Sequence, residues 1–140
     1  MGAAPLLVVE DNDKNMKLLR DVLVANGYRV LEATTGREAL ALAAQHRPAL
    51  VLMDIRLPDI DGVDALDQLR RDERTASIPV VALTAQAMQG DRERFLAAGF
   101  DGYIPKPVNI VELVHLVGAH CDDRRSGERE RQDSNPRPPA

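Results

Sequence analysis

The sequence has little that would suit a secreted, zinc-binding or membrane-embedded protein. Its 140 residues include a single cysteine, Cys121, and no tryptophan. A lone cysteine forms no intrachain disulfide and supplies no cysteine set for structural zinc, which favours a reducing compartment. The apolar runs fall far short of the ~20 residues that cross a bilayer, and residues 1–5 lack the positive charge of a signal peptide. We therefore predict a cytoplasmic protein that does not enter a membrane.

The charge balance lacks the basic excess of a nucleic-acid-binding surface. There are 18 Lys and Arg residues against 22 Asp and Glu residues, which gives a net charge of −4. Such a balance does not neutralise a phosphate backbone. We therefore expect no nucleic acid among the partners of the main surface.

A glycine-rich phosphate-binding loop is also missing. Neither Gly-x-Gly-x-x-Gly nor Gly-x-x-x-x-Gly-Lys-Ser/Thr follows the first apolar run, Leu6–Val9. The residues that do follow it, Glu10, Asp11 and Asn12, would repel a phosphate unless a metal ion were bound. This argues against a nucleotide- or flavin-binding module, although such modules often use the fold predicted next.

What the chain does contain is an alternation of two hydrophobic patterns. Short apolar runs indicate β-strands, and between them apolar residues recur three and four positions apart, as on the buried face of a helix. Strands joined by helices of this length lie parallel, with right-handed crossovers. We therefore predict an α/β fold with a doubly wound five-stranded parallel sheet, whose strands are Leu6–Val9, Tyr28–Leu31, Ala49–Met53, Ile78–Leu83 and Gly102–Ile104.

Local signals set the expected limits of these elements. Gly27 and Gly99 stand where a helix can end on a left-handed residue. Residues 1–121 have the length and the apolar content of one domain. Residues 122–140 are charged and proline-rich without apolar periodicity, so we expect them to form a disordered polar tail.

Polar residues stand where the predicted strands end, and ligands bind at this carboxyl edge in open parallel sheets. The first strand leads into Glu10 and Asp11, the third into Asp54, the fourth into Thr84 and the fifth toward Lys106. Three carboxylates in one cleft disfavour one another's ionisation unless a cation compensates them. Magnesium suits oxygen ligands and commonly bridges carboxylates to phosphate oxygens. The pattern therefore predicts a Mg²⁺ site and phosphoryl chemistry.

Several short motifs resemble the receiver domain of bacterial two-component response regulators, over roughly residues 5 to 120. They are Val9–Asn12, Met53–Pro58 with Asp61–Gly62, Leu83–Ala85 and Lys106–Pro107. Two longer stretches, Glu10–Leu18 and Ala87–Arg94, are most similar to single-domain cell-division regulators of the DivK type. The resemblance implies a flavodoxin-like (βα)5 fold with strand order 2-1-3-4-5.

The resemblance also implies roles for the residues that would handle the phosphoryl group. Asp54 would be the phosphoacceptor. Lys106 would pair with one phosphoryl oxygen, and the Thr84 hydroxyl would donate to another. The chain would then be no enzyme in the ordinary sense, because its only chemistry would be Mg²⁺-dependent self-phosphorylation and autodephosphorylation.

For the metal, the resemblance implies a ligand set drawn from the same edge. Asp11, Asp54 and the backbone carbonyl of Arg56 would hold Mg²⁺, and Glu10 would assist through a coordinated water. Many receivers have an aspartate in place of Glu10. The longer glutamate side chain can still reach a bound water.

The family further implies partners and a switch. The phosphoryl donor would be a histidine kinase or a histidine phosphotransfer protein, and Thr84 and Tyr103 would transmit phosphorylation to a partner surface. That surface would combine the expected fourth helix, around Phe95, with the strand Gly102–Ile104 and the last helix. No second folded domain is expected after Cys121, so the signal would leave through protein contacts.

Two other functions stay open at this stage. A strand-end aspartate is also the nucleophile of haloacid-dehalogenase-like phosphatases. Those enzymes carry an Asp-x-Asp motif, and here Arg56 stands in the place of the second aspartate. The chain also has no room for their cap domain. The second alternative is a receiver module that belongs to a hybrid histidine kinase.

Overall fold

The computed structural model describes residues 4–85 and 91–129. Within them, five strands alternate strictly with five helices, as predicted. In chain order these are β1 (Leu6–Val9), α1 (Asp13–Ala25), β2 (Val30–Ala33), α2 (Gly36–His46), β3 (Leu50–Asp54), α3 (Gly62–Arg71), β4 (Val80–Thr84), α4 (Asp91–Ala98), β5 (Gly102–Pro105) and α5 (Ile110–Arg129).

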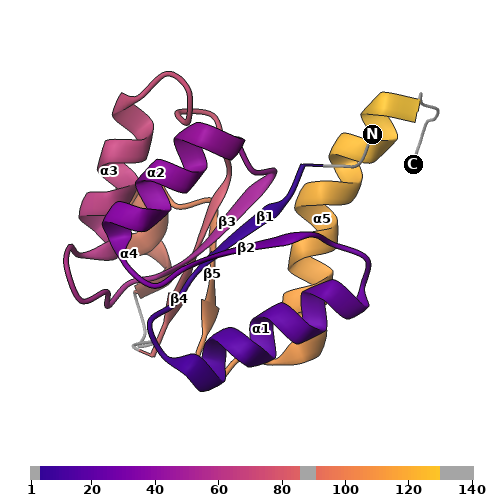
Figure 1. Ribbon diagram of the computed structural model, residues 1–140, viewed down its shortest axis with the longest axis horizontal. Helices are drawn as coiled ribbons and strands as arrows, with labels where there is room; N and C mark the ends of the chain where they lie inside the picture. Colours follow the sequence, from indigo (N-terminus) through magenta and orange to yellow (C-terminus); the bar gives the residue numbers. More distant parts are fainter. Residues whose placement is uncertain (1–3, 86–90, 130–140) are drawn as a thin grey trace.

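The strands form one parallel sheet in the order β2-β1-β3-β4-β5, which confirms the predicted fold. Helices α1 and α5 cover one face of the sheet, and α2, α3 and α4 cover the other (Figure 1). None of the helices in the described ranges is long and apolar enough to span a bilayer. The two-sided cover explains why the central strands read as continuous apolar runs.

The core is split by the sheet into two clusters. On β1, Leu7 and Val9 pack with residues of α2 and α3, whereas Leu6 and Val8 pack with residues of α1 and α5. The strands β1, β3 and β4 are buried along their whole length. Each large aliphatic side chain buried in this way stabilises the fold by about 1.5 to 3 kcal/mol.

Strand β2 begins two residues later than the predicted run Tyr28–Leu31. Gly27 ends α1 with φ +91°, as expected for a helix C-terminus. The Tyr28 amide still donates to the Leu23 carbonyl at 3.1 Å, so Tyr28 belongs to that turn and not to the strand. At its other end the strand includes Glu32, which an apolar run would exclude but an edge strand exposes to solvent.

Helix α5 continues to Arg129, past the domain end predicted at residue 121. The residues after Cys121 have no apolar stripe in the sequence, but Arg and Glu recur among them and are good helix formers, which favours continuation of the helix. Its last turns extend beyond the sheet (Figure 1). Residues 130–140 of the predicted tail lie outside the described residues.

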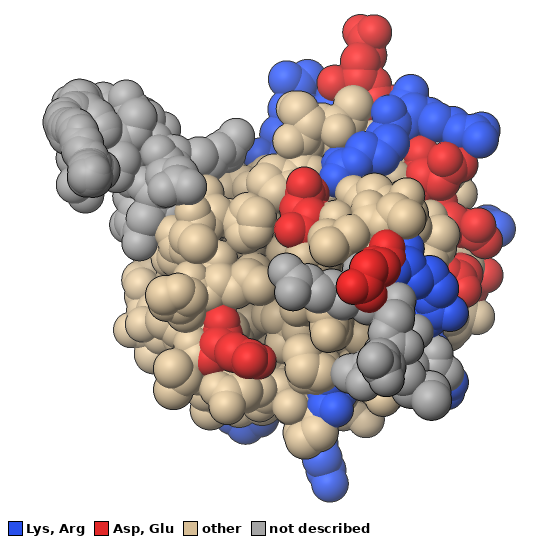
Figure 2. All heavy atoms as spheres, turned by 180° about the vertical axis from the view of Figure 1, so that it is seen from behind, with Lys and Arg blue, Asp and Glu red and all other residues tan. Residues whose placement is uncertain are grey.

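The molecular surface mixes charges of both signs. Figure 2 shows acidic and basic side chains interspersed on the face behind that of Figure 1. Local ion pairs among the described residues include Arg71 with Asp67 at 3.0 Å and Arg74 with Asp72 at 2.8 Å. Pairing of this kind weakens the field that each charge would create alone.

Candidate functional site

The predicted site residues converge at the carboxyl edge of the sheet. Asp54 and Thr84 are the last residues of β3 and β4, and the Lys106 amide donates to the Thr84 carbonyl at 2.7 Å. Together with residues that follow β1, they line a cavity of about 250 Å³. Its lining consists of Glu10, Asp11, Asn12, Asn15, Asp54, Ile55, Arg56, Thr84, Ala85 and Lys106.

Lys106 is the cation that contacts the buried carboxylates of this cavity. Its Nζ lies 2.9 Å from Asp54 Oδ2 and 2.9 Å from Glu10 Oε1. Burial opposes the charged form of the amine, but hydrogen bonds and charge from Glu10 and Asp54 outweigh it and raise the Lys106 pKa. The peptide bond from Lys106 to Pro107 is cis. Lys106 is therefore a fixed positive charge between two carboxylates.

Asp54 is a buried carboxylate with both oxygens held. Oδ1 accepts from the Arg56 amide at 3.0 Å, and Oδ2 accepts from Lys106. Gly62, at the start of α3, lets the chain fold back against this point, because a Cβ there would lie 2.7 Å from the Asp54 carbonyl oxygen. The carboxylate thus has a set orientation and opens into the cavity.

Glu10 is almost fully buried, with 1% of its surface exposed. Oε2 accepts from the Asn12 amide at 3.2 Å, while Oε1 has its ion pair with Lys106 and no further hydrogen bond among the described residues. Burial raises the Glu10 pKa, the Lys106 hydrogen bond lowers it, and Asp54 raises it again, so the net pKa shift is upward. Lys106 therefore does not fully compensate the negative charge of the Glu10 carboxylate.

The acidic residues of the cavity fit a divalent cation. Carboxylate oxygens of Glu10, Asp11 and Asp54 can lie within 4.8 Å of one another. Asp11 is exposed, so its side chain can meet an ion that enters from solvent. The incompletely satisfied Glu10 Oε1 and the surplus of negative charge over Lys106 are what a hard oxygen-seeking ion such as Mg²⁺ would relieve.

Two asparagines of the cavity lining, Asn12 and Asn15, had no role in the predicted site. Asn12 caps α1 by accepting from the Asn15 amide at 3.0 Å, and Asn15 lines the cavity from the first turn of that helix. Asn15 follows the N-cap Asn12 by three positions, the spacing at which a capping side chain accepts from a backbone amide of the first turn, and that spacing was the available signal. The first turn of α1 is thus part of the cavity wall.

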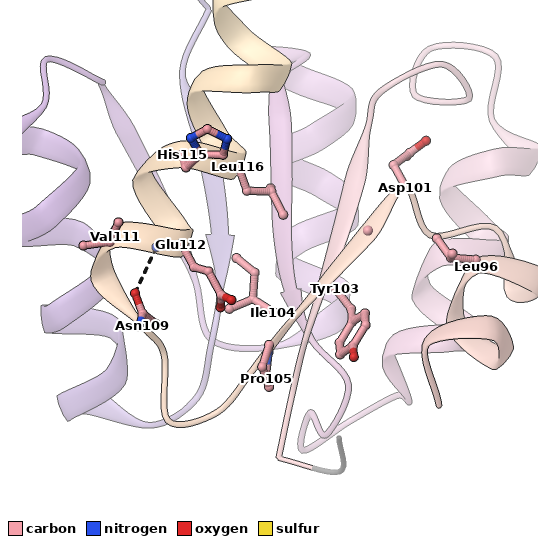
Figure 3. Close-up of a pocket in the computed structure, with 11 residues that line it drawn as sticks. Leu96, Asp101, Tyr103, Ile104, Pro105, Asn109, Val111, Glu112, His115 and Leu116 are labelled. Atoms are coloured by element: carbon pink, nitrogen blue, oxygen red, sulfur yellow. Dashed lines mark hydrogen bonds between the residues drawn. The ribbon is translucent and has the colours of Figure 1, made fainter. Parts of the chain in front are cut away.

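Tyr103 lies on another surface, formed by α4, β5 and α5. It lines a cavity of about 770 Å³ together with Leu96, Ile104, Val111 and Leu116 (Figure 3). Its ring is half-buried and tilted against Phe95, with 6.1 Å between ring centroids. The structure therefore separates Tyr103 from the acidic cavity. The stretch Ala87–Arg94, which resembles DivK-type regulators, is described only in part, because residues 87–90 lie outside the described residues.

Comparison with known proteins agrees with this geometry. The family model described as the response regulator receiver domain matches residues 6–118. The chain belongs to the response regulator receiver family. Domains of this family are phosphoacceptor signalling domains that bind Mg²⁺ at their acidic site.

Individual relatives narrow the likeness to one group of this receiver family. The polar-differentiation response regulator DivK of Brucella anthropi is 42% identical over 118 residues, which cover 84% of this chain and 96% of that protein. DivK of Brucella suis has the same identity and coverage. The receiver domain described here is therefore DivK-like.

Solved receiver structures share its fold. The receiver domain of a sensor histidine kinase from Pseudomonas aeruginosa, which has a magnesium ion coordinated in its active site cleft, is 37% identical with a TM-score of 0.79. The comparison covers 86% of this chain and 99% of that one. A response regulator from Chloroflexus aurantiacus is 32% identical with a TM-score of 0.80, at the same coverage.

Proposed function

We propose that this receiver is a single-domain response regulator that accepts a phosphoryl group on Asp54 from a histidine kinase or a histidine phosphotransfer protein. One observation carries the proposal. The buried Asp54 carboxylate is held between the Arg56 amide and Lys106, within reach of Glu10 and Asp11, and lines a cavity of about 250 Å³.

In the proposed reaction, a carboxylate oxygen of Asp54 bonds to phosphorus while the phosphorus–nitrogen bond of phosphohistidine breaks. The leaving imidazole nitrogen keeps the electron pair and takes up a proton. Lys106, already 2.9 Å from Asp54, pairs with a phosphoryl oxygen, and the Thr84 hydroxyl donates to another. The side chains contribute by positioning and charge, and Asp54 is the residue of this chain whose covalent state changes, while the donor histidine returns to its unphosphorylated form.

Asp11, Asp54 and the Arg56 carbonyl would hold Mg²⁺, and Glu10 would reach a coordinated water. Bound there, the ion would neutralise negative charge on the carboxylates and on the incoming phosphoryl group. The raised pKa of Glu10 and the surplus of acidic groups support this assignment. An ion held by so few protein ligands keeps several waters and binds weakly.

Asp54→Asn tests the acceptor. The amide keeps the shape but removes the anionic nucleophile, so incubation with acetyl phosphate and Mg²⁺ should give no phosphorylated protein by mass spectrometry. Asp67→Asn, on the exposed side of α3, is the matched control and should label like the wild type. The wild-type adduct should be lost in hydroxylamine, as an acyl phosphate is. Undiminished labelling of Asp54→Asn would remove Asp54 from the proposal.

The output is proposed to leave through the α4, β5 and α5 surface. A phosphoryl group on Asp54 draws the Thr84 hydroxyl inward, which frees space into which the Tyr103 ring turns. Phosphorylation then shifts the population of the two states by its differential affinity, typically ~1 to 3 kcal/mol. The cavity beside Tyr103 supports a partner at this place (Figure 3).

Thr84→Ala separates acceptance from output. The variant should still take phosphate on Asp54, but the amide resonances of Tyr103, Ile104 and Ile110 should no longer shift on phosphorylation. Equal shifts in wild type and variant would show that the signal takes another route. The proposed acceptor would survive that result.

A receiver within a hybrid histidine kinase is the second candidate, because one 37% identical structure is the receiver of a sensor histidine kinase. The 42% identity to DivK proteins, over nearly their whole length, favours the single-domain assignment. A phosphotransfer profile against the histidine kinases of the host distinguishes the two.

The cytoplasmic location and the division into a receiver at 1–121 and a polar tail at 122–140 stay predictions.

A further inference from the structure

The loop from Ile55 to Asp61, between β3 and α3, is anchored to a helix that makes no direct contribution to the acidic cavity. Asp59 Oδ1 accepts from the Gly36 amide at 2.8 Å, and Oδ2 accepts from the Arg37 amide at 2.9 Å. Both amides belong to the first turn of α2. One carboxylate therefore binds the loop to α2 by two hydrogen bonds.

These bonds complete the N-terminus of α2. The first amides of a helix have no partner within the helix. The Glu38 amide is satisfied by Thr35 Oγ1 at 3.1 Å, in the usual way for an N-cap, whereas the two preceding amides depend on Asp59. Burial opposes the ionised form of Asp59, but the backbone hydrogen bonds outweigh it and lower the Asp59 pKa. The carboxylate is thus charged and held in place at neutral pH.

Steric fit holds the same contact from the side of the helix. A Cβ on Gly36 would collide with Ile60 Cγ1, would lie 2.8 Å from Ile60 Cδ1, and would approach Asp59 Oδ1 to 3.4 Å. The absence of a side chain at Gly36 is therefore what allows the loop to dock on α2.

The other end of the loop is held just as closely. The Gly62 amide donates to the Ile55 carbonyl at 2.9 Å, and a Cβ on Gly62 would lie 2.7 Å from the Asp54 carbonyl oxygen. Between these two anchors lies Arg56, whose amide holds Asp54 Oδ1 at 3.0 Å. Arg56 is thus preceded by Ile55, which is held by the Gly62 amide, and followed by Asp59, which is held by α2.

We propose that Asp59 is a positioning residue for the Mg²⁺ site: its two hydrogen bonds to α2 fix the loop that presents the Arg56 carbonyl and the Arg56 amide to the metal and to Asp54. This inference rests on the proposed function, since it assumes a metal at the acidic cavity. It adds a residue outside the cavity, and a helix behind it, to the structure that holds the ligands.

Magnesium titration of the wild type and four variants tests the proposal. The variants are Asp59→Ala, Asp59→Asn, Thr35→Ala and Gly36→Ala. Binding is followed by calorimetry and by the ¹H–¹⁵N resonances of Asp54 and Arg56, because the chain has no tryptophan to report it. Thr35→Ala is the matched control. It also removes an acceptor from the first turn of α2, but the hydrogen bond that it removes is with Glu38 and not with a loop residue.

Asp59→Ala should weaken Mg²⁺ binding by about tenfold, the lower end of the effect of outer-shell partners on metal sites. Asp59→Asn keeps one acceptor and should lose less. Without metal, Asp59→Ala should already move the Arg56 resonance, and Thr35→Ala should leave both that resonance and the affinity unchanged. Gly36→Ala should reproduce the loss by displacing Ile60, which checks the contact without altering Asp59.

Unchanged affinity in Asp59→Ala, or an equal loss in Thr35→Ala, would overturn the proposal, since Asp59 would then serve only the stability of α2. Acetyl phosphate labelling of the wild type separates this result from failure of the proposed function. Normal labelling with equal affinities rejects the positioning role alone. A wild type that takes no phosphate rejects the acceptor assignment itself.

Discussion

A cation meets a carboxylate at each end of the sheet, and the two pairs are built differently. At the carboxyl edge, Lys106 lies 2.9 Å from both Glu10 and Asp54. At the amino edge, Arg70 of α3 lies 3.0 Å from Asp101 and also donates to the carbonyls of three residues in the segments that lead into β4 and β5, namely Ala76, Ile78 and Gly99.

The two cations differ in the amount of negative charge that surrounds each of them. Arg70 faces one carboxylate and neutral carbonyls, and Asp101 is satisfied further by the Val80 amide at 2.8 Å. Lys106 faces two buried carboxylates, and the Glu10 pKa stays raised in spite of it. The amino edge is complete without a ligand, whereas the carboxyl edge retains negative charge that a bound cation would lower. Stability and ligand binding are thus assigned to opposite ends of one sheet.

Removing Arg70 should give the largest change in stability. Arg70→Met leaves three carbonyls and Asp101 without this donor, and we expect a loss of about 2 kcal/mol, below the cost of breaking a fully buried pair because the site is partly exposed. Urea unfolding measures the loss.

The neighbouring Arg71→Met, which breaks an exposed pair with Asp67, is the control and should change the stability little. Phosphorylation by acetyl phosphate should stay intact in both, and its loss in Arg70→Met would mean that the two edges are coupled.

Magnesium should stabilise the protein through the carboxyl edge alone. At ten times its dissociation constant, an ion that binds only the native state adds about 1.4 kcal/mol. We expect this increment in the wild type and in Arg70→Met, but not in Asp11→Ala, which should lose Mg²⁺ binding and phosphorylation together. Asp13→Ala, two residues further along, lies outside the cavity lining and is the control. A full increment in Asp11→Ala, seen by thermal unfolding, would place the ion elsewhere.

The two edges also differ in how far the sequence could predict them. The strand-end residues Asp54 and Thr84 follow from a general rule, because parallel strands bring their carboxyl ends to one edge. Their detailed roles came from the family resemblance. Strand β2 was misplaced by two residues because an edge strand mixes polar and apolar positions, so its burial pattern is weak.

Side-chain contacts over long sequence separations could not be predicted in this way. Asp59 and Gly36 are 23 residues apart, and Arg70 and Asp101 are 31 residues apart. Each contact depends on how helices dock on the sheet and on which rotamer reaches across, and neither leaves a periodic signal in the sequence. Asp59 in particular reads locally as an ordinary turn residue after Pro58.

The smallest expected effect is the pH dependence that Glu10 contributes without metal. Because burial raises the Glu10 pKa above 4.5, the folded state holds this proton at pH values where the unfolded chain has released it. Stability contributed by Glu10 is therefore greatest at acid pH and falls as the pH rises from 4.5 through the raised pKa. Glu10→Gln removes this dependence and keeps the side-chain volume. The stability difference, wild type minus Glu10→Gln, should then decrease with rising pH in urea unfolding, and saturating Mg²⁺ should flatten it. A difference that grows with pH would show that Lys106 already balances both carboxylates, which would remove the contrast between the two edges.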